Sequence, residues 1–185
     1  GIWTITERLQ SSVPPEILFI ERCTQLLVPG GRMGIVLPDS ILGSPGLGYI
    51  REWLIQNHRI IASVDLHVDT FQPRNGTQTS VLFLQKKTEE QKAREASTGQ
   101  MADYNIFMAM VERVGHDKRG NPLFKRDVEG NEILAPDTDT ILVLGETGEG
   151  DRTVSHERRS KIPDDQTTDV SAIFDDWKRR EGIAW

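Results

Sequence analysis

Apolar residues between positions 17 and 27 recur at the spacing of an α-helix. Pro14 and Pro15 precede this stretch, and proline is tolerated in the first turn of a helix because an N–H there would have no helical partner. Pro29-Gly30-Gly31 follows as a helix breaker. The apolar positions are Ile17, Leu18, Ile20, Cys23, Leu26 and Leu27. The pattern predicts one helix of about twelve residues.

Three further apolar stretches have the length of β-strands. Residues 32–37 are almost continuously apolar between turn signals, which predicts a strand buried on both faces. Residues 60–66 and 79–84 predict two more strands, with a turn-rich connection at 71–78. Residues 49–57 return to helical spacing between the first two strands. The order helix, strand, helix, strand, loop, strand is that of half a doubly wound α/β sheet.

The second half of the chain is more polar. Residues 88–103 predict a connection that is either a solvated helix or mobile, and residues 104–114 alternate as a strand before a hairpin tip at 115–122. Glycines and charges predict loop or disorder further on, before an amphipathic helix at 169–181. We find no internal repeat. The predicted parts are an α/β part (1–87), a polar connection (88–103), a β-rich extension (104–144), a loop or disordered segment (145–168) and a C-terminal helix (169–185).

Two segments of the sequence resemble a known protein family. Residues 29–39 read Pro-Gly-Gly-Arg-Met-Gly-Ile-Val-Leu-Pro-Asp, and residues 70–86 read Thr-Phe-Gln-Pro-Arg-Asn-Gly-Thr-Gln-Thr-Ser-Val-Leu-Phe-Leu-Gln-Lys. With the preceding helix, this succession resembles the C-terminal half of the catalytic domain of N6-adenine DNA methyltransferases, above all the methylation subunits of type I restriction-modification systems. Residues 114–123, Val-Gly-His-Asp-Lys-Arg-Gly-Asn-Pro-Leu, are similar to a phrase of the same subunits.

The resemblance implies a fold class and a fragment. The expected fold is α/β, a partial Rossmann-like methyltransferase sheet made of the last three strands, the final one antiparallel, with a following β-hairpin and a C-terminal helix. Members of the family bind S-adenosylmethionine at a glycine-rich turn and hold adenine with Asn-Pro-Pro-Tyr or Asn-Pro-Pro-Phe. Neither motif occurs here, since Pro14-Pro15 is followed by Glu16. We therefore expect a fragment without catalytic residues that is inactive alone and binds no cofactor tightly, whereas its intact parent uses S-adenosylmethionine.

The resemblance also assigns the residues that contact the substrate. Such enzymes rotate the target adenine out of the duplex, and an aromatic side chain can replace its lost stacking neighbours. Phe71 matches the aromatic position in the loop before the last strand, although it could instead close the core. Arg74, Asn75, Thr77 and Thr79 are expected to contact the displaced base or a nearby phosphate. Each of these four polar residues could also be a turn residue only.

Asp39 follows a predicted strand at its carboxyl end, where doubly wound sheets bind their ligands. It is a candidate for cofactor binding, and capping of the next helical turn is an equal alternative. Lys118 and Arg119 at the hairpin tip could touch DNA phosphate, or be ordinary solvated residues. The four histidines are scattered and the single cysteine falls on a predicted helix, so no metal site is expected.

Charge divides the chain unevenly. Of the total of -6, residues 1–126 carry 15 basic against 13 acidic side chains and residues 127–185 carry 7 against 15. The acidic third predicts a protein partner rather than DNA contact. No apolar run approaches the roughly 18 residues of a membrane span, which predicts a cytoplasmic protein, bacterial or archaeal by its resemblance. The implied partners are DNA, a specificity subunit, a restriction subunit where the parent also cleaves DNA, and a second copy of the fragment. A non-enzymatic scaffold or protein-binding module is the alternative function.

Overall fold

The computed structural model describes residues 13–143 and 152–183. The two helices and three strands predicted between residues 17 and 84 are confirmed. The elements are α1 (Pro15–Leu26), β1 (Arg32–Pro38), α2 (Asp39–Gly43), the 3-10 helix η1 (Pro45–Leu47), α3 (Gly48–Asn57), β2 (His58–Leu66), β3 (Thr79–Lys86), α4 (Glu89–Thr98), β4 (Phe107–Met110), β5 (Leu134–Val143), β6 (Arg152–Lys161) and α5 (Thr167–Glu181). Among the described residues no helix is long and apolar enough to cross a membrane.

Four strands form a mixed sheet in the order β1-β3-β2-β4. Strand β3 is antiparallel to both of its neighbours, and β4 is parallel to β2. The mixed α/β class and the antiparallel final strand of the predicted set are thus confirmed. The prediction that residues 104–114 belong to a separate extension is wrong for β4, because Phe107 pairs with Ala62 and is 8% exposed. The sheet therefore continues beyond residue 87.

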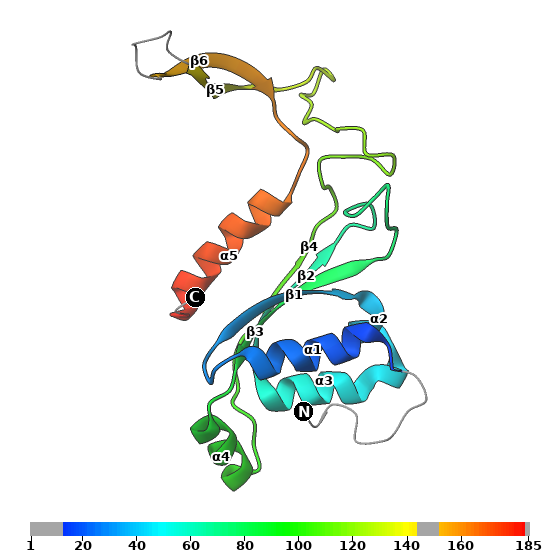
Figure 1. Cartoon of the computed structure of the whole chain (residues 1–185), viewed down its shortest axis with the longest axis vertical. Coiled ribbons are helices and arrows are strands. Elements are labelled where there is room, and N and C mark those ends of the chain that lie inside the picture. The colour runs from blue at the N-terminus through cyan, green and yellow to red at the C-terminus, as the bar shows by residue number, and fades with distance from the viewer. Residues whose placement is uncertain (1–12, 144–151, 184–185) are drawn as a thin grey trace.

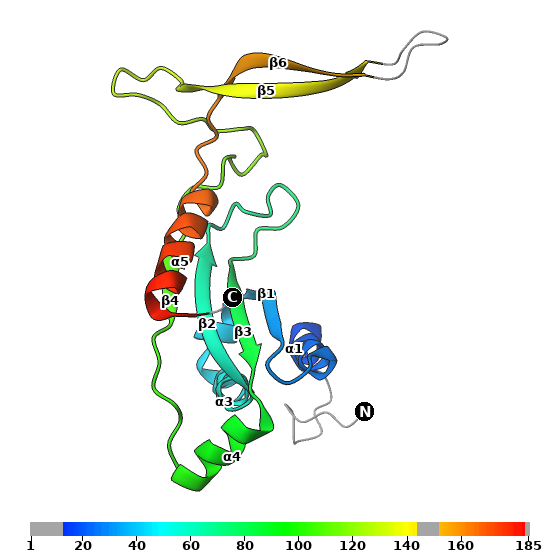
Figure 2. The same ribbon diagram turned by 90° about the vertical axis from the view of Figure 1, so that its left-hand side faces the viewer.

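Helices cover the two faces of this sheet. Helices α1 and α3 pack on one face, and α5 lies on the opposite side (Figure 1 and Figure 2). A register shift between Ile60 and Ala62 places an extra residue in β2. Since side chains alternate along a strand, the extra residue lets Ile60 face the first core while Ala62 and Val64 face the second.

Strand β1 is covered on one face only. Ile35 and Leu37 are buried against the helices, whereas Val36 between them is 47% exposed. The prediction of a strand buried on both faces is therefore wrong. The physical reason is the position of α5, whose apolar residues contact β2, β3 and β4 rather than β1.

Helix α5 confirms the predicted C-terminal helix. Phe174 lies between Phe83, Phe107 and Trp177, with ring centroids 5.2–5.8 Å away. This aromatic cluster fastens the helix to the sheet, as aromatic pairs at such distances contribute beyond their buried area. Trp185 lies outside the described residues.

Strands β5 and β6 form a separate two-stranded antiparallel ribbon that stands away from the sheet (Figure 1 and Figure 2). The prediction that residues 145–168 are loop or disorder is therefore wrong for Arg152–Lys161, while residues 144–151 lie outside the described part. Backbone pairing from Leu134↔Lys161 to Val143↔Arg152 forms the ribbon without an apolar repeat in β6. The polar connection at 88–103 contains the regular helix α4, closed by a capping box between Thr88 and Gln91.

Candidate functional site

The carboxyl ends of three parallel strands meet at one edge of the sheet. Strands β1, β2 and β4 run in the same direction, and antiparallel β3 begins at this edge. Helix α2 follows β1 there, and the loop of residues 67–78, here called the edge loop, follows β2. Open α/β sheets bind ligands outside the carboxyl ends of their strands. This edge is the candidate site.

Gln78 ties the ends of two strands together. Its side-chain amide donates to Asp65 Oδ1 at 2.9 Å and to the Leu66 carbonyl at 2.6 Å, both at the end of β2. The backbone carbonyl of Gln78 accepts a hydrogen bond from the Asp39 N–H at 3.1 Å, next to the end of β1. The sequence interpretation gave Gln78 no role, and its place immediately before a predicted strand was the only signal.

Asp39 faces β3 rather than capping a helix. Ser80 Oγ donates to Asp39 Oδ1 at 2.9 Å. Pro38 occupies the N-cap position of α2, and no side chain caps that helix. The capping alternative is therefore not what the structure has, and the role of Asp39 in cofactor binding stays a prediction.

The edge loop is folded by local hydrogen bonds that leave Phe71 at the surface. The Phe71 carbonyl accepts from the Asn75 N–H at 3.0 Å, and Asn75 Oδ1 accepts from the Thr77 N–H at 2.9 Å. Phe71 is 42% exposed and belongs to neither core cluster. The alternative in which Phe71 closes the core is thus not realised, and its ring is available to a partner from outside.

The predicted contact residues do not share one surface. Asn75 and Thr77 are exposed on the edge loop together with Phe71. Thr79 is 6% exposed in β3, and its hydroxyl is buried without a hydrogen-bond partner among the described residues. In this arrangement the Thr79 hydroxyl is not accessible to a base, while Phe71, Asn75 and Thr77 are.

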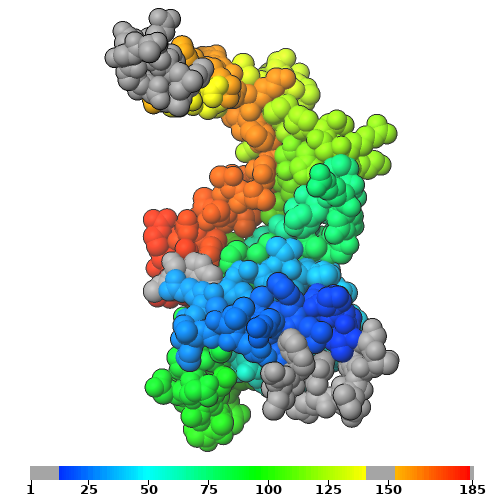
Figure 3. Space-filling model, viewed as in Figure 1, coloured from blue at the N-terminus to red at the C-terminus, as the bar shows by residue number. Residues whose placement is uncertain are grey.

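A second turn packs against the edge loop. Gly120 has a φ of +81°, and a Cβ at this position would lie 3.3 Å from Pro73 Cδ. The turn of residues 117–121 is closed by Asp117, whose Oδ1 accepts from the Arg119 and Asn121 N–H groups at 2.8 and 2.9 Å. The Asn121 side chain and these backbone groups hold the pKa of the Asp117 carboxyl below its usual range. Figure 3 shows the two segments in contact.

The same turn occurs twice in this part of the chain. Asp127 Oδ1 accepts from the Glu129 and Asn131 N–H groups at 3.1 and 2.8 Å, and Gly130 has a φ of +89°. The signal in the sequence was Asp-x-x-Gly-Asn at residues 117–121 and again at 127–131. Glycine suits both turns because it adopts positive φ without a steric cost.

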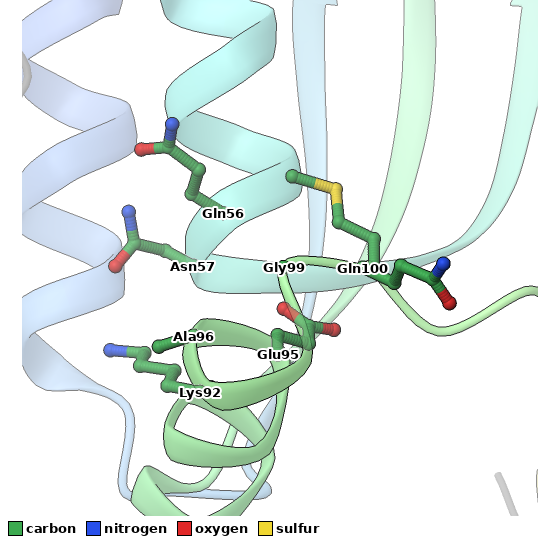
Figure 4. Close-up of a pocket in the computed structure, with 8 residues that line it drawn as sticks. Gln56, Asn57, Lys92, Glu95, Ala96, Gly99 and Gln100 are labelled. Atoms are coloured by element: carbon green, nitrogen blue, oxygen red, sulfur yellow. The ribbon is translucent and has the colours of Figure 1, made fainter.

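Three cavities lined by described residues lie away from Asp39 and Phe71. One of about 430 Å³ lies between α3 and α4, next to the start of β2 (Figure 4). Glu95 in its lining accepts a hydrogen bond from Lys87 Nζ at 2.6 Å, and this bond lowers the pKa of the Glu95 carboxyl. Another of about 400 Å³ lies under α5, and the third is near Arg59 and Tyr104.

Asp39 and the segment after β1 are the described groups closest to the edge where the sequence predicts cofactor binding. Asp39 is the carboxylate at the end of β1, and it is already engaged by Ser80. Gly43 and Gly46 in the segment after β1 have open space around them.

Comparison with known proteins identifies the family. The model of the N-6 DNA methylase family matches residues 6–131, more than half of the chain. The chain belongs to the N-6 DNA methylase family. No curated protein matches it.

Solved structures give partial likenesses. A Listeria monocytogenes protein (lmo1582), assigned as a class I S-adenosylmethionine-dependent methyltransferase, has a TM-score of 0.40 and 20% identity over 51% of this chain and 26% of its own. The M protein of the type I restriction enzyme EcoKI has a TM-score of 0.38 and 31% identity over 42% of this chain and 16% of its own. A chain of a type I restriction-modification system has a TM-score of 0.36 and 26% identity over 38% of this chain and 15% of its own. The chain thus spans only 15–26% of these proteins.

Proposed function

We propose that the chain is the carboxyl-terminal portion of the catalytic domain of a site-specific DNA adenine-N6 methyltransferase of a restriction-modification system. The observation that carries the proposal is Phe71, an aromatic ring 42% exposed on the loop between β2 and β3 at the carboxyl edge of the sheet. Membership in the N-6 DNA methylase family supports the chemistry.

Phe71 acts in this proposal as a stacking surface. An adenine inside a duplex cannot present its amino group, so it is rotated out of the helix and loses both stacking neighbours. Stacking on an aromatic ring restores roughly 1 to 3 kcal/mol per base. Asn75 and Thr77 supply polar groups beside the ring, and Thr79 forms part of the buried strand beneath them.

The intact enzyme supplies what this chain lacks. S-adenosylmethionine provides the methyl group when bound, and the residues that hold it and the amino group of adenine lie in another part of the enzyme. The chain alone is inactive and does not bind the cofactor tightly. In the intact complex its partners are DNA, a specificity subunit that selects the sequence and, where DNA is also cleaved, a restriction subunit.

The experiment uses an enzyme that contains this whole chain. Phe71→Ala should lower the methylation rate, whereas Phe71→Trp should retain much of it, because tryptophan also stacks. Phe19→Ala is the matched control, since Phe19 is 63% exposed on α1. A fluorescent adenine analogue at the target position reports stacking on Phe71 through quenching of its emission.

Unfolding measurements on the same variants separate stacking from stability. If Phe71→Ala changes neither the methylation rate nor the emission of the analogue, Phe71 is not the stacking residue and the base pocket lies elsewhere. A methylation loss that Phe19→Ala reproduces to the same extent would likewise count against a specific role.

The ribbon favours a second candidate function, a non-enzymatic protein-binding module. A two-stranded ribbon without a covering layer is marginally stable in water, so β5 and β6 are suited to a protein partner. The reading frame before Gly1 discriminates the two functions. A glycine-rich turn and Asn-Pro-Pro-Tyr or Asn-Pro-Pro-Phe encoded there supports the enzyme, and a stop codon there supports the module.

A further inference from the structure

Three exposed cations lie on the two segments that touch at the candidate site. Arg74 belongs to the edge loop, and Lys118 and Arg119 belong to the turn of residues 117–121. None of the three has a salt-bridge partner among the described residues, whereas Arg113 is bound to Asp164 and Arg158 to Asp137. They lie in residues 1–126, which carry 15 basic against 13 acidic side chains.

The carboxylate next to Lys118 and Arg119 is already engaged. The Asp117 carboxylate accepts hydrogen bonds from its own turn. A Cβ at Gly120 would lie 3.3 Å from Pro73 Cδ, so the turn lies against the edge loop and places Lys118 and Arg119 beside the segment that carries Phe71. Arg74 is three residues from Phe71, hence within about 11 Å of it along the chain.

We propose that Arg74, Lys118 and Arg119 bind the phosphate backbone of DNA next to the target adenine, and that the Gly120–Pro73 contact positions the turn for this. The inference rests on the proposed function and extends it to the way in which the duplex is held. Lysine and arginine contacts to phosphate fix the register of a protein on DNA without reading its sequence. They also release condensed counterions, so affinity falls as salt rises.

The chain contains a matched control for this turn. Residues 127–131 have the same Asp-x-x-Gly-Asn hydrogen bonds, with Val128 and Glu129 in place of the two cations. The first turn carries two cations and one carboxylate, and the second carries two carboxylates and no cation. A Cβ at Gly130 would meet nothing within 4 Å, whereas one at Gly120 would meet Pro73.

Binding is measured with the 185-residue chain and a fluorescein-labelled 20-base-pair duplex, by anisotropy at several salt concentrations. Lys118→Gln with Arg119→Gln should weaken binding at least ten-fold at low salt and lower the slope of log affinity against log salt by about 2, since each phosphate contact contributes about 1. Arg74→Gln should lower the slope by about 1. Val128→Gln with Glu129→Gln should leave both quantities unchanged or raise affinity.

A pair of glycine variants tests the positioning contact while every charge is kept. Gly120→Ala should weaken binding several-fold because the added methyl group moves the turn from Pro73. Gly130→Ala introduces the same backbone strain at a position that faces no neighbouring atom, so this variant should not weaken DNA binding. Thermal unfolding of each variant verifies that the chain is folded.

Equal affinity and slope for the wild type and the Lys118→Gln, Arg119→Gln variant would overturn the proposal. An affinity loss shared by Gly120→Ala and Gly130→Ala would overturn the positioning role. Failure of this proposal is distinct from failure of the proposed function, because the Phe71 variants are judged by methylation and base stacking. If those variants behave as expected while the slope does not change, the enzyme assignment stands and only the phosphate contacts are wrong.

Discussion

Acidification should destabilise the fold through one buried imidazole. His58 is fully buried at the start of β2, with Nδ1 3.2 Å from the Leu54 carbonyl and Nε2 3.1 Å from Thr24 Oγ1. Burial lowers the pKa of His58 from 6.5 to about 4. The Leu54 carbonyl opposes this shift, and Lys86 and its neighbouring lysines add to it.

The sign of the effect follows from where the proton binds. The unfolded chain takes up a proton near pH 6.5, whereas the folded chain does so only near pH 4. Stability from the neutral ring is therefore fully present above pH 6.5 and is lost as the pH falls toward 4. The whole difference corresponds to about 3 kcal/mol of unfolding free energy, of which about 2 kcal/mol is lost by pH 5.

His58→Phe removes this titration and leaves the neighbouring groups satisfied. In the variant, the Leu54 carbonyl still accepts a hydrogen bond from the backbone N–H of residue 58. The Thr24 hydroxyl still donates to the Ile20 carbonyl. Urea unfolding followed by tryptophan fluorescence is suitable, because the ring of Trp53 lies 5.8 Å from that of His58. Between pH 7 and pH 5 the wild type should lose about 2 kcal/mol more than the variant.

Exposed His156 provides the control, since His156→Gln should follow the wild-type pH dependence. Comparing variants also cancels the carboxyl groups that titrate at lower pH. Parallel stability curves for the wild type and His58→Phe over this range would refute the assignment of a neutral buried imidazole.

Three further predictions concern the edge of the sheet and the C-terminal helix. The isolated chain should bind S-adenosylmethionine weakly or not at all, and calorimetry showing micromolar binding at one site per chain would contradict this. The chain should self-associate through β1, because this strand pairs only with β3 among the described strands and leaves one edge open. Light scattering should show a lower association constant for Val36→Lys than for the wild type. A wild type that is monomeric at every concentration would count against this prediction. Phe174→Ala should cost about 2 to 3 kcal/mol of stability, less than for a fully buried phenylalanine because its ring is half-buried. Ile173→Ala, at a position 55% exposed on the same helix, should cost little, and equal losses in urea unfolding would contradict the docking of α5 by its aromatic residues.

Local signals in the sequence determined the helices and the longer strands of the first part. The spacing of Ile17 and Ile20 after two prolines was enough for α1, because helical hydrogen bonds and the buried face both repeat within four residues. The turn-rich segment between two strands placed Phe71 in a loop, and only the structure showed that its ring is exposed instead of closing the core. The family resemblance, and not the spacing, supplied the expectation that it meets a base.

Only the tertiary structure decided which segments lie together. Strand β6 has no apolar repeat, and it is a strand because β5 supplies backbone partners along its length. Strand β4 joined the sheet because Phe107 fits under α5, a helix sixty residues later in the chain. The contact of Gly120 with Pro73 and the hydrogen bonds of Gln78 also join distant residues. The sequence thus determined elements whose bonds are local, whereas pairing partners and the composition of the site depend on long-range packing that no short window of residues contains.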